Sequence, residues 1–243
     1  TEVRIPEEIE GLPVRIIAKK TFLSRKQLRK AVLPVTIEEI GDWAFAYCTN
    51  LESVWLPKKK MKLGSRIVME CPNVRWIYAY GTEPGRGDAG GKQAGGKDRD
   101  SQCAALLAAG AGMLDTEYLM DPAEAGSESW IRKWDARMNA VMAEEDSEGY
   151  TKMILCGEED YGSSLEEFVK NKRKGKVRLA LLRLMNPIGL QKDTEDRLRE
   201  YLVSHTKGCD TEESWEVVLK EYGHKKEYYG KFAEIGCVTE ANF

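Results

Sequence analysis

The sequence predicts an α+β protein with two domains: a short right-handed solenoid with parallel β-strands, followed by an all-α domain of helical hairpins. Three observations predict this class. One phrase near the N-terminus recurs three times at a spacing of 23 residues. A glycine-rich polar segment follows it, and beyond that segment the apolar residues change to a helical period. The expected parts are therefore residues 1–80, a flexible linker at 81–100, and a helical domain at 101–243.

The repeated phrase is six residues long, and its copies are Ile17–Phe22, Ile40–Phe45 and Leu63–Val68. Flanking positions keep the same spacing: Leu28, Leu51 and Val74; Ala31, Val54 and Ile77; Leu33 and Leu56; Cys48 and Cys71. A short fixed period predicts stacked coils, each of which buries its apolar side chains against its neighbours. Solenoids of this kind present extended surfaces to partners, whereas catalysis usually needs a concave pocket with convergent polar groups.

The repeat resembles the BspA-type leucine-rich repeat family. Residues 33–57 carry nearly the whole pattern of that family, with Leu-Pro at each end and the pairs Ile-Gly and Ala-Phe between them. The opening Ile5–Val14 is similar to the first unit of the family, which has a longer turn. The third unit departs from the pattern, since Lys58–Lys60 enters it and Val68 replaces the aromatic residue. The resemblance covers residues 1–80. It implies a leucine-rich-repeat solenoid with a binding role, typical of surface-displayed or secreted bacterial proteins.

Strand alternation places two columns of side chains on the outer face of the predicted sheet. In residues 51–56 the leucines and the valine turn inwards, so Ser53 and Trp55 point outwards. A shift of 23 residues in each direction extends both positions into the neighbouring units. The resulting columns are Val32–Trp55–Tyr78 and Lys30–Ser53–Trp76. Three aromatic rings on one face form an apolar patch typical of an interaction site, and Trp and Tyr are enriched in binding hot spots.

The occupant of this face is left open by the sequence. A protein partner of unknown identity is one possibility, with the helical domain supplying a second surface or a lid. In a second, the helical domain or the linker covers the patch within one chain. In a third, the patch pairs with a second copy of the chain to form a homodimer.

The sequence therefore favours a non-catalytic protein-binding or scaffold protein, not an enzyme, with no cofactor and no metal. One alternative is an enzyme or nucleotide-dependent regulator with a site in the helical domain, around His205, Cys209 and His224. Zinc at that place needs further ligands, so a surface histidine and a core thiol are the simpler interpretation. The other alternative is a surface adhesin-like structural protein, which the family resemblance suggests.

Two short motifs in the linker are better explained by its composition. Residues 91–98 nearly spell a phosphate-binding loop, but Asp98 stands where a hydroxyl must ligate magnesium. The preceding strand also ends too early for such a loop. The adhesion tripeptide Arg86–Asp88 lies in a segment built from glycine, arginine and aspartate, where it is expected by chance.

Charge and cysteine usage restrict the remaining classes. Residues 1–80 hold 14 Lys and Arg against 9 Asp and Glu, and residues 81–243 hold 23 against 31, giving nets of +5 and −8. The basic residues lack a nucleic-acid reading motif, and no apolar run approaches the roughly 20 residues that span a bilayer. Neither nucleic-acid binding nor membrane insertion is expected. Localisation stays open: the six cysteines, which lack disulfide-like spacing, slightly favour the cytoplasm, whereas the family favours the cell surface or secretion.

The second half of the chain carries helix signals. Asp121–Pro122 predicts the start of a helix with Trp130 on its apolar stripe. Ser164 and Glu167 form a capping box for a further helix. Short capped helices predict antiparallel hairpins, and Trp215–Phe243 weakly resembles ankyrin-like repeats. The start at Thr and the end at a helix start lead us to expect a native protein that continues at both ends.

Overall fold

The described part of the chain separates into two compact units. The computed structural model describes residues 1–81, 99–114, 116–151, 164–207, 212–240 and 242. The repeat unit is Thr1–Trp134 and the helical unit is Asp135–Phe243. This division lies elsewhere than the linker predicted at 81–100, because the first helix after the repeats packs against them. Residues 82–98 lie outside the described residues, and Arg99 and Asp100 already belong to that helix.

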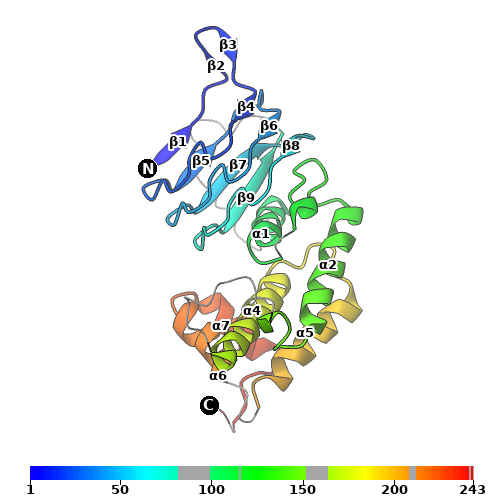
Figure 1. The fold of residues 1–243 in the computed structure, drawn as a ribbon. Coiled ribbons are helices and arrows are strands. Elements are labelled where there is room, and N and C mark those ends of the chain that lie inside the picture. The colour runs from blue at the N-terminus through cyan, green and yellow to red at the C-terminus, as the bar shows by residue number, and fades with distance from the viewer. Residues whose placement is uncertain (82–98, 115, 152–163, 208–211, 241, 243) are drawn as a thin grey trace. The chain divides into compact units, whose positions relative to one another are not determined.

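The repeat unit is built on a four-stranded sheet (Figure 1). Its strands, in spatial order, are β1 (Glu2–Arg4), β5 (Lys30–Val32), β7 (Ser53–Pro57) and β9 (Trp76–Tyr80). All neighbouring strands are parallel. Lys30 lies beside Ser53, and Ser53 beside Trp76, so the register advances by the period of the repeated phrase. The parallel strands and their register confirm what that phrase predicts.

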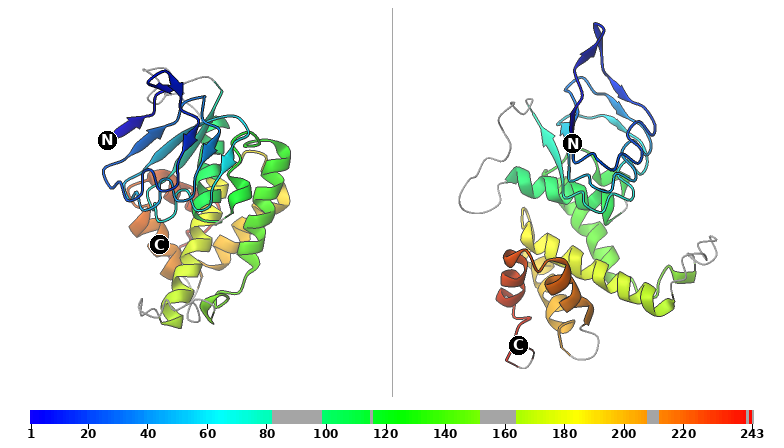
Figure 2. Two further views of the ribbon diagram at one scale, coloured as in Figure 1. Left: turned by 45° about the horizontal axis from the view of Figure 1, so that its top comes forward. Right: turned by 90° about the vertical axis from the view of Figure 1, so that its left-hand side faces the viewer.

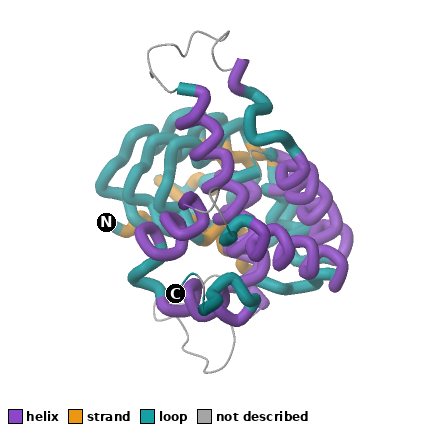
Figure 3. The backbone as a smooth tube through the Cα atoms, turned by 90° about the horizontal axis from the view of Figure 1, so that it is seen from below, coloured by secondary structure: helices purple, strands orange, loops and turns teal. Residues whose placement is uncertain are grey.

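A second parallel sheet runs across the same coils. It consists of β4 (Ile16–Ile17), β6 (Glu39–Ile40) and β8 (Lys62–Leu63), and a hairpin of β2 (Glu8–Ile9) and β3 (Leu12–Pro13) precedes it. Figure 2 shows the coils stacked on one another, and Figure 3 shows their loops running side by side. Ala31, Val54 and Ile77 share one interior row and are buried to within 2% exposure. Apolar side chains stacked in rows therefore form the core of the coils.

Hydrogen bonds between coils repeat with the same period. The Cys48 thiol donates to the Phe22 carbonyl at 3.0 Å, and the Cys71 thiol donates to the Phe45 carbonyl at 3.1 Å. Burial raises the pKa of the Cys71 thiol to about 12, so this thiol stays protonated and able to donate at neutral pH. Both cysteines are free thiols, of which Cys48 is buried and Cys71 is half-buried. The same shift relates two amide bonds of 2.7 Å: Asn50 to the Lys26 carbonyl, and Asn73 to the Thr49 carbonyl.

Two glycines let the coils approach closely. A Cβ atom on Gly41 would lie 2.5 Å from the Lys19 backbone nitrogen, and one on Gly64 would lie 2.4 Å from the Asp42 backbone nitrogen. Such contacts are too short for any residue with a side chain, which explains the Ile-Gly pair of the repeat. Each coil also has two left-handed backbone positions occupied by residues other than glycine. They have φ between 52° and 61° and are Lys20, Trp43 and Arg66, and Ser24, Tyr47 and Glu70.

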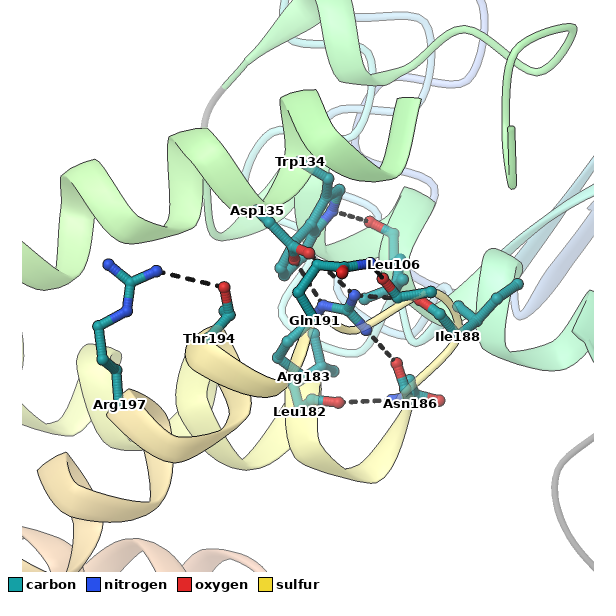
Figure 4. A network of polar contacts seen from close by, with 11 residues as sticks. Leu106, Trp134, Asp135, Leu182, Arg183, Asn186, Ile188, Gln191, Thr194 and Arg197 are labelled. Atoms are coloured by element: carbon teal, nitrogen blue, oxygen red, sulfur yellow. Dashed lines mark hydrogen bonds and ion pairs between the residues drawn. The ribbon is translucent and has the colours of Figure 1, made fainter. Parts of the chain in front are cut away.

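The first helix after the repeats covers the last strand. α1 (Arg99–Gly112) packs against β9, and its buried face consists largely of alanine. Two tryptophans of the next helix fasten this part of the repeat unit. Trp134 Nε1 donates to the Leu106 carbonyl of α1 at 2.9 Å (Figure 4), and Trp130 Nε1 donates to the Leu119 carbonyl at 3.0 Å. Leu119 ends the short 3₁₀ turn η1, Glu117–Leu119.

The helix that carries these tryptophans begins later than the sequence predicts. α2 spans Glu128–Ala143, so the prediction of a start at Asp121–Pro122 was wrong. Asp121 Oδ1 instead accepts a hydrogen bond from the Ala123 nitrogen at 2.9 Å, within a turn. Gly126 then adopts φ +82°, a left-handed conformation that interrupts any helix there. Ser127 becomes the effective cap, since its hydroxyl accepts from the Trp130 nitrogen at 3.2 Å.

The helical unit is arranged around one long helix. α4 (Leu165–Met185) contacts each of the other elements: α5 (Lys192–Ser204), α6 (Glu212–Trp215), the π-helical η4 (Glu216–Glu221) and α7 (Lys226–Glu234). The N-cap predicted at Ser164 is confirmed, because its side chain accepts from the Glu167 nitrogen at 3.2 Å. No helix among the described residues has the length and apolar character needed to cross a membrane.

A buried ion pair joins α2 to the end of α4 within the helical unit (Figure 4). Arg183 is completely buried, and its Nε and Nη2 donate to the two carboxylate oxygens of Asp135 at 2.6 and 3.1 Å. The same guanidinium donates to the carbonyls of Asn186 and Ile188 at 2.5 and 3.0 Å. Arg183 thus neutralises a buried carboxylate and satisfies the carbonyls that follow the helix.

Candidate partner-binding face

The outer face of the four-stranded sheet carries the two predicted columns of side chains. The register aligns Lys30 with Ser53 and Trp76, and Val32 with Trp55 and Tyr78. Neighbouring strands lie about 4.8 Å apart, so side chains at aligned positions touch. We call the part of this face formed by Lys30, Ser53, Trp55, Trp76 and Tyr78 the aromatic face. All five side chains are half-buried.

A stacked pair of rings lies at the centre of the aromatic face. The ring centroids of Trp55 and Tyr78 are 4.2 Å apart, with 23° between the ring planes. The Lys30 ammonium lies 5.4 Å from the Trp55 ring centroid and 3.3 Å from a carboxylate oxygen of Glu2. Stacking and the cation above the ring hold the indole in one orientation. Binding of a partner to these rings therefore costs little side-chain conformational entropy.

Val32 departs from its expected role. The sequence places it among the outward contacts, but its side chain is only 1% exposed, so the expectation that it points outwards was wrong. Its neighbours in the column are Arg4 on one side and Trp55 on the other. Both side chains are much larger than valine. Val32 lies beneath the aromatic face and is no part of its surface.

Tyr80 borders the aromatic face and was missed by the sequence reasoning. It pairs in register with Pro57, two positions beyond the Tyr78 row. Its ring is 8% exposed, and its hydroxyl donates to the Leu33 carbonyl. Strand alternation could have identified it, because a position two residues after Tyr78 lies on the same side of the sheet.

The indole nitrogen of Trp55 lacks a hydrogen-bond acceptor. Among the described residues no acceptor lies within bonding distance of this buried Nε1. Trp130 and Trp134 in the same unit each donate to a carbonyl. Buried donors are nearly always satisfied in native proteins, so the exception at Trp55 calls for a physical reason.

The alternative site in the helical unit is only partly described. The His205 ring stacks on Tyr201 at 4.0 Å, and His205 Nδ1 lies 2.8 Å from the Tyr201 carbonyl and 3.0 Å from the Ser204 hydroxyl. Cys209 lies outside the described residues, as do the two linker motifs at 86–88 and 91–98. Within the part of the chain that the structure describes, no three potential metal-ligating side chains gather at one place.

The repeat unit also contains a hollow of about 250 Å³ beside the start of α1. Its charged lining is mixed, with Lys58 and Arg99 opposed by Asp100 and Glu124. The Arg99 guanidinium is already engaged, because its Nη2 donates to the Gly126 carbonyl at 2.8 Å. This mixture favours neither anions nor cations, and the aromatic face remains the better candidate site.

Parallel strands at a constant shift, with rows of apolar side chains inside, define a solenoid of stacked repeats in this part of the chain. Residues 5–80 match the family model described as the BspA type leucine rich repeat region, in six copies. These residues are a BspA-type leucine-rich repeat region, as their sequence pattern indicated. The match ends before Trp215–Phe243, the stretch that weakly resembles ankyrin-like repeats. No curated protein and no solved structure matches the chain.

Proposed function

We propose that this chain is a non-catalytic protein-binding or scaffold protein that holds a protein partner on its aromatic face. The observation that supports this most is the stacked Trp55–Tyr78 pair, with Trp76 in the adjoining column. In this proposal the repeats act as a short right-handed solenoid, and Lys30 and Ser53 supply polar contacts beside the rings. The helical unit supplies a second surface or a lid.

Physical chemistry favours these residues as the centre of an interface. Trp and Tyr bury a large area with few rotatable bonds, and they dominate the binding energy of many interfaces. The rings of the aromatic face are held by neighbours on parallel strands, so the surface is organised before a partner arrives. Repeat proteins of this type use extended surfaces in this way.

The test is to remove the Trp55 and Tyr78 rings by substitution. An affinity pull-down with the intact protein identifies the partner, and calorimetry then compares the native protein with the double variant Trp55→Ala, Tyr78→Ala. We expect affinity to fall by at least about 2 kcal/mol, the size of a hot-spot effect. Tyr118→Ala is the matched control, because Tyr118 is 58% exposed but lies in η1, away from the sheet.

Folding must be checked beside affinity. Thermal unfolding of the double variant should resemble that of the native protein, because both rings are half-buried on the outer face. Unchanged affinity with intact folding would exclude the aromatic face as the site. The same variant tests whether the face forms a homodimer. In that case analytical sedimentation shows a dimer for the native protein and a monomer for the double variant.

A further inference from the structure

The hollow beside the start of α1 is built from several elements of the repeat unit. Lys58 directly follows β7, Arg99 and Asp100 belong to the first turn of α1, and Glu124 lies in the turn before α2. Figure 1 shows α1 beside β9, whose Ala79 lines the same hollow. Its volume of about 250 Å³ lies just below that of pockets for drug-sized ligands, so the expected occupant is a smaller molecule.

The charged groups of the hollow are not paired with one another. Among the described residues, neither Lys58 nor Arg99 forms an ion pair with a carboxylate of the lining. Glu124 instead pairs with Lys133, at 3.7 Å, which is no part of the lining. Arg99 donates through Nη2 to the Gly126 carbonyl, and its other N–H groups remain, since a guanidinium carries several donors. Charges of both signs are therefore available to a ligand.

This mixed lining is complementary to a molecule that carries both charges. A simple anion would be repelled by the carboxylates of the lining, and a simple cation would be repelled by Lys58 and Arg99. A zwitterion pairs each of its ends with groups of the opposite sign. Its carboxylate can accept hydrogen bonds from Lys58 and Arg99, and its ammonium group can donate to Asp100 and Glu124.

The uncharged part of the lining indicates the size of the ligand's side chain. It consists of small residues, which are Ala79, Cys103, Ala123, Ala125, Gly126 and Ser127. None of these described residues offers an aromatic ring or a long aliphatic chain to a large apolar group. The lining therefore favours an amino acid whose side chain is small and apolar.

We propose that this hollow binds a free α-amino acid with a small apolar side chain. Lys58 and Arg99 hold the carboxylate of the ligand, and Asp100 and Glu124 hold its ammonium group. Because these residues come from the coils, from α1 and from the turn before α2, the bound ligand connects all of these elements. The site goes beyond the proposed function, since none of its residues belongs to the aromatic face.

The first experiment compares L-alanine with propionate and ethylamine in ligand-observed NMR titrations of the full chain. Propionate is alanine without its ammonium group, and ethylamine is alanine without its carboxylate. The four charged side chains are exposed, so each contact contributes modestly. We expect alanine to bind at least about fivefold more tightly than either analogue. Equal binding by an analogue, or no binding of alanine at high millimolar concentration, would overturn the inference.

Hydrogen exchange resolved by peptide fragments locates the bound ligand. With L-alanine present, exchange should slow across residues 99–103 and 123–127, because the ligand connects these segments to the coils. Exchange across β1, at the far edge of the four-stranded sheet, should not change. Protection that appears only outside the segments of the hollow would overturn the location of the site.

A charge reversal at Lys58 tests the carboxylate end of the ligand. Lys58→Glu makes the lining predominantly acidic, so alanine should bind about two- to fivefold more weakly and ethylamine more tightly than to the native protein. Lys26→Glu is the matched control, because Lys26 is an exposed lysine of the first coil and no part of the lining. The same change in both variants would assign the effect to net charge and overturn the role of Lys58.

A neutral substitution at Asp100 tests the ammonium end. Asp100→Asn should weaken alanine binding by about two- to fivefold and leave propionate binding no weaker. Asp193→Asn is the matched control, because both aspartates lie in the first turn of a helix and Asp193 belongs to α5. Thermal unfolding without ligand checks that each variant folds. Native affinity for alanine in folded Asp100→Asn and Lys58→Glu would overturn the inference.

Discussion

The repeat unit and the helical unit are each stabilised internally by a different kind of contact. In the repeat unit, a contact in one coil has a counterpart one coil further on, such as the thiol bonds of Cys48 and Cys71. In the helical unit the main contacts are individual, such as the burial of Arg183 against Asp135. A substitution in one coil thus removes one of several similar contacts. A substitution at Arg183 removes a contact that has no counterpart among the described residues.

The helical unit also uses an irregular element to place its charges. Within η4 the Tyr222 nitrogen donates to the Val217 carbonyl, a bond that spans five residues. This wider spacing allows Glu216 and Glu221 both to face α4. Glu216 lies 2.5 Å from Lys174, and Glu221 accepts two hydrogen bonds from Arg178, at 2.6 and 2.7 Å. No repeated pattern specifies this arrangement, in contrast to the coils.

The largest effect is expected from Arg183→Met. This change leaves the Asp135 carboxylate buried without its cation, and it should cost about 3–5 kcal/mol in the helical unit. Hydrogen exchange resolved by peptide fragments is the suitable measurement, because a chain of two units need not unfold in one step. We expect faster exchange across α4 and α5 and little change across β5, β7 and β9.

The double variant Arg183→Met, Asp135→Leu is the control for that experiment. Replacing both charges by apolar groups removes the stranded carboxylate, so protection should largely return. If the double variant exchanges as fast as the single one, the loss comes from the carbonyls of Asn186 and Ile188 and not from the charge on Asp135.

An intermediate effect is expected from Gly41→Ala in the repeat unit. The added Cβ would meet the Lys19 backbone nitrogen at 2.5 Å, so the coils must separate locally at a cost of about 1–3 kcal/mol. The same substitution at Gly175 in α4 is the matched control. A Cβ there has open space, and alanine should stabilise the helix by about 0.5–1 kcal/mol. Equal signs for the two changes in free energy of unfolding would contradict the close approach of the coils.

The smallest effect is a pH dependence confined to the helical unit. Hydrogen bonds from Lys174 and Lys220 lower the pKa of Glu216 from its usual 4.5 to about 2. A lowered pKa in the folded state stabilises the fold above the unfolded value and loses that stabilisation as pH falls from about 4.5 towards 2. Hydrogen exchange at η4 should therefore rise in this window. Glu216→Gln should flatten the change, and an unaltered profile would assign the acid sensitivity to another carboxylate.

Most of the aromatic face could be predicted because a solenoid converts sequence spacing into spatial register. The alignment of Trp55 with Tyr78 follows from the period and from strand alternation alone. The burial of Val32 did not follow, since it depends on the sizes of Arg4 and Trp55 on the neighbouring strands. The missing acceptor at Trp55 was also beyond prediction, because it depends on atomic surroundings that no period encodes.

Local signals were less reliable where a glycine or an unusual backbone intervened. The capping box at Ser164 was predictable from two residues at fixed spacing. The start of α2 was not, because the left-handed Gly126, four residues after Pro122, prevents a helix from starting at the proline. The left-handed positions, such as Trp43 and Tyr47, carry no glycine to reveal them, and their conformation follows from the path of the whole coil.

The constant offset between bonded residues also governs how this molecule can grow. The Cys48 thiol donates to the Phe22 carbonyl of the preceding coil, and the Cys71 thiol donates to the Phe45 carbonyl in the same way. An inserted duplicate of residues 34–56 would therefore find the matching acceptor on the coil before it and offer the same acceptor to the coil after it. Insertion of whole coils therefore preserves the register, while an insertion of any other length shifts all later coils out of register. Each added repeat would bring its own copy of Trp55, and with it a longer column of stacked rings.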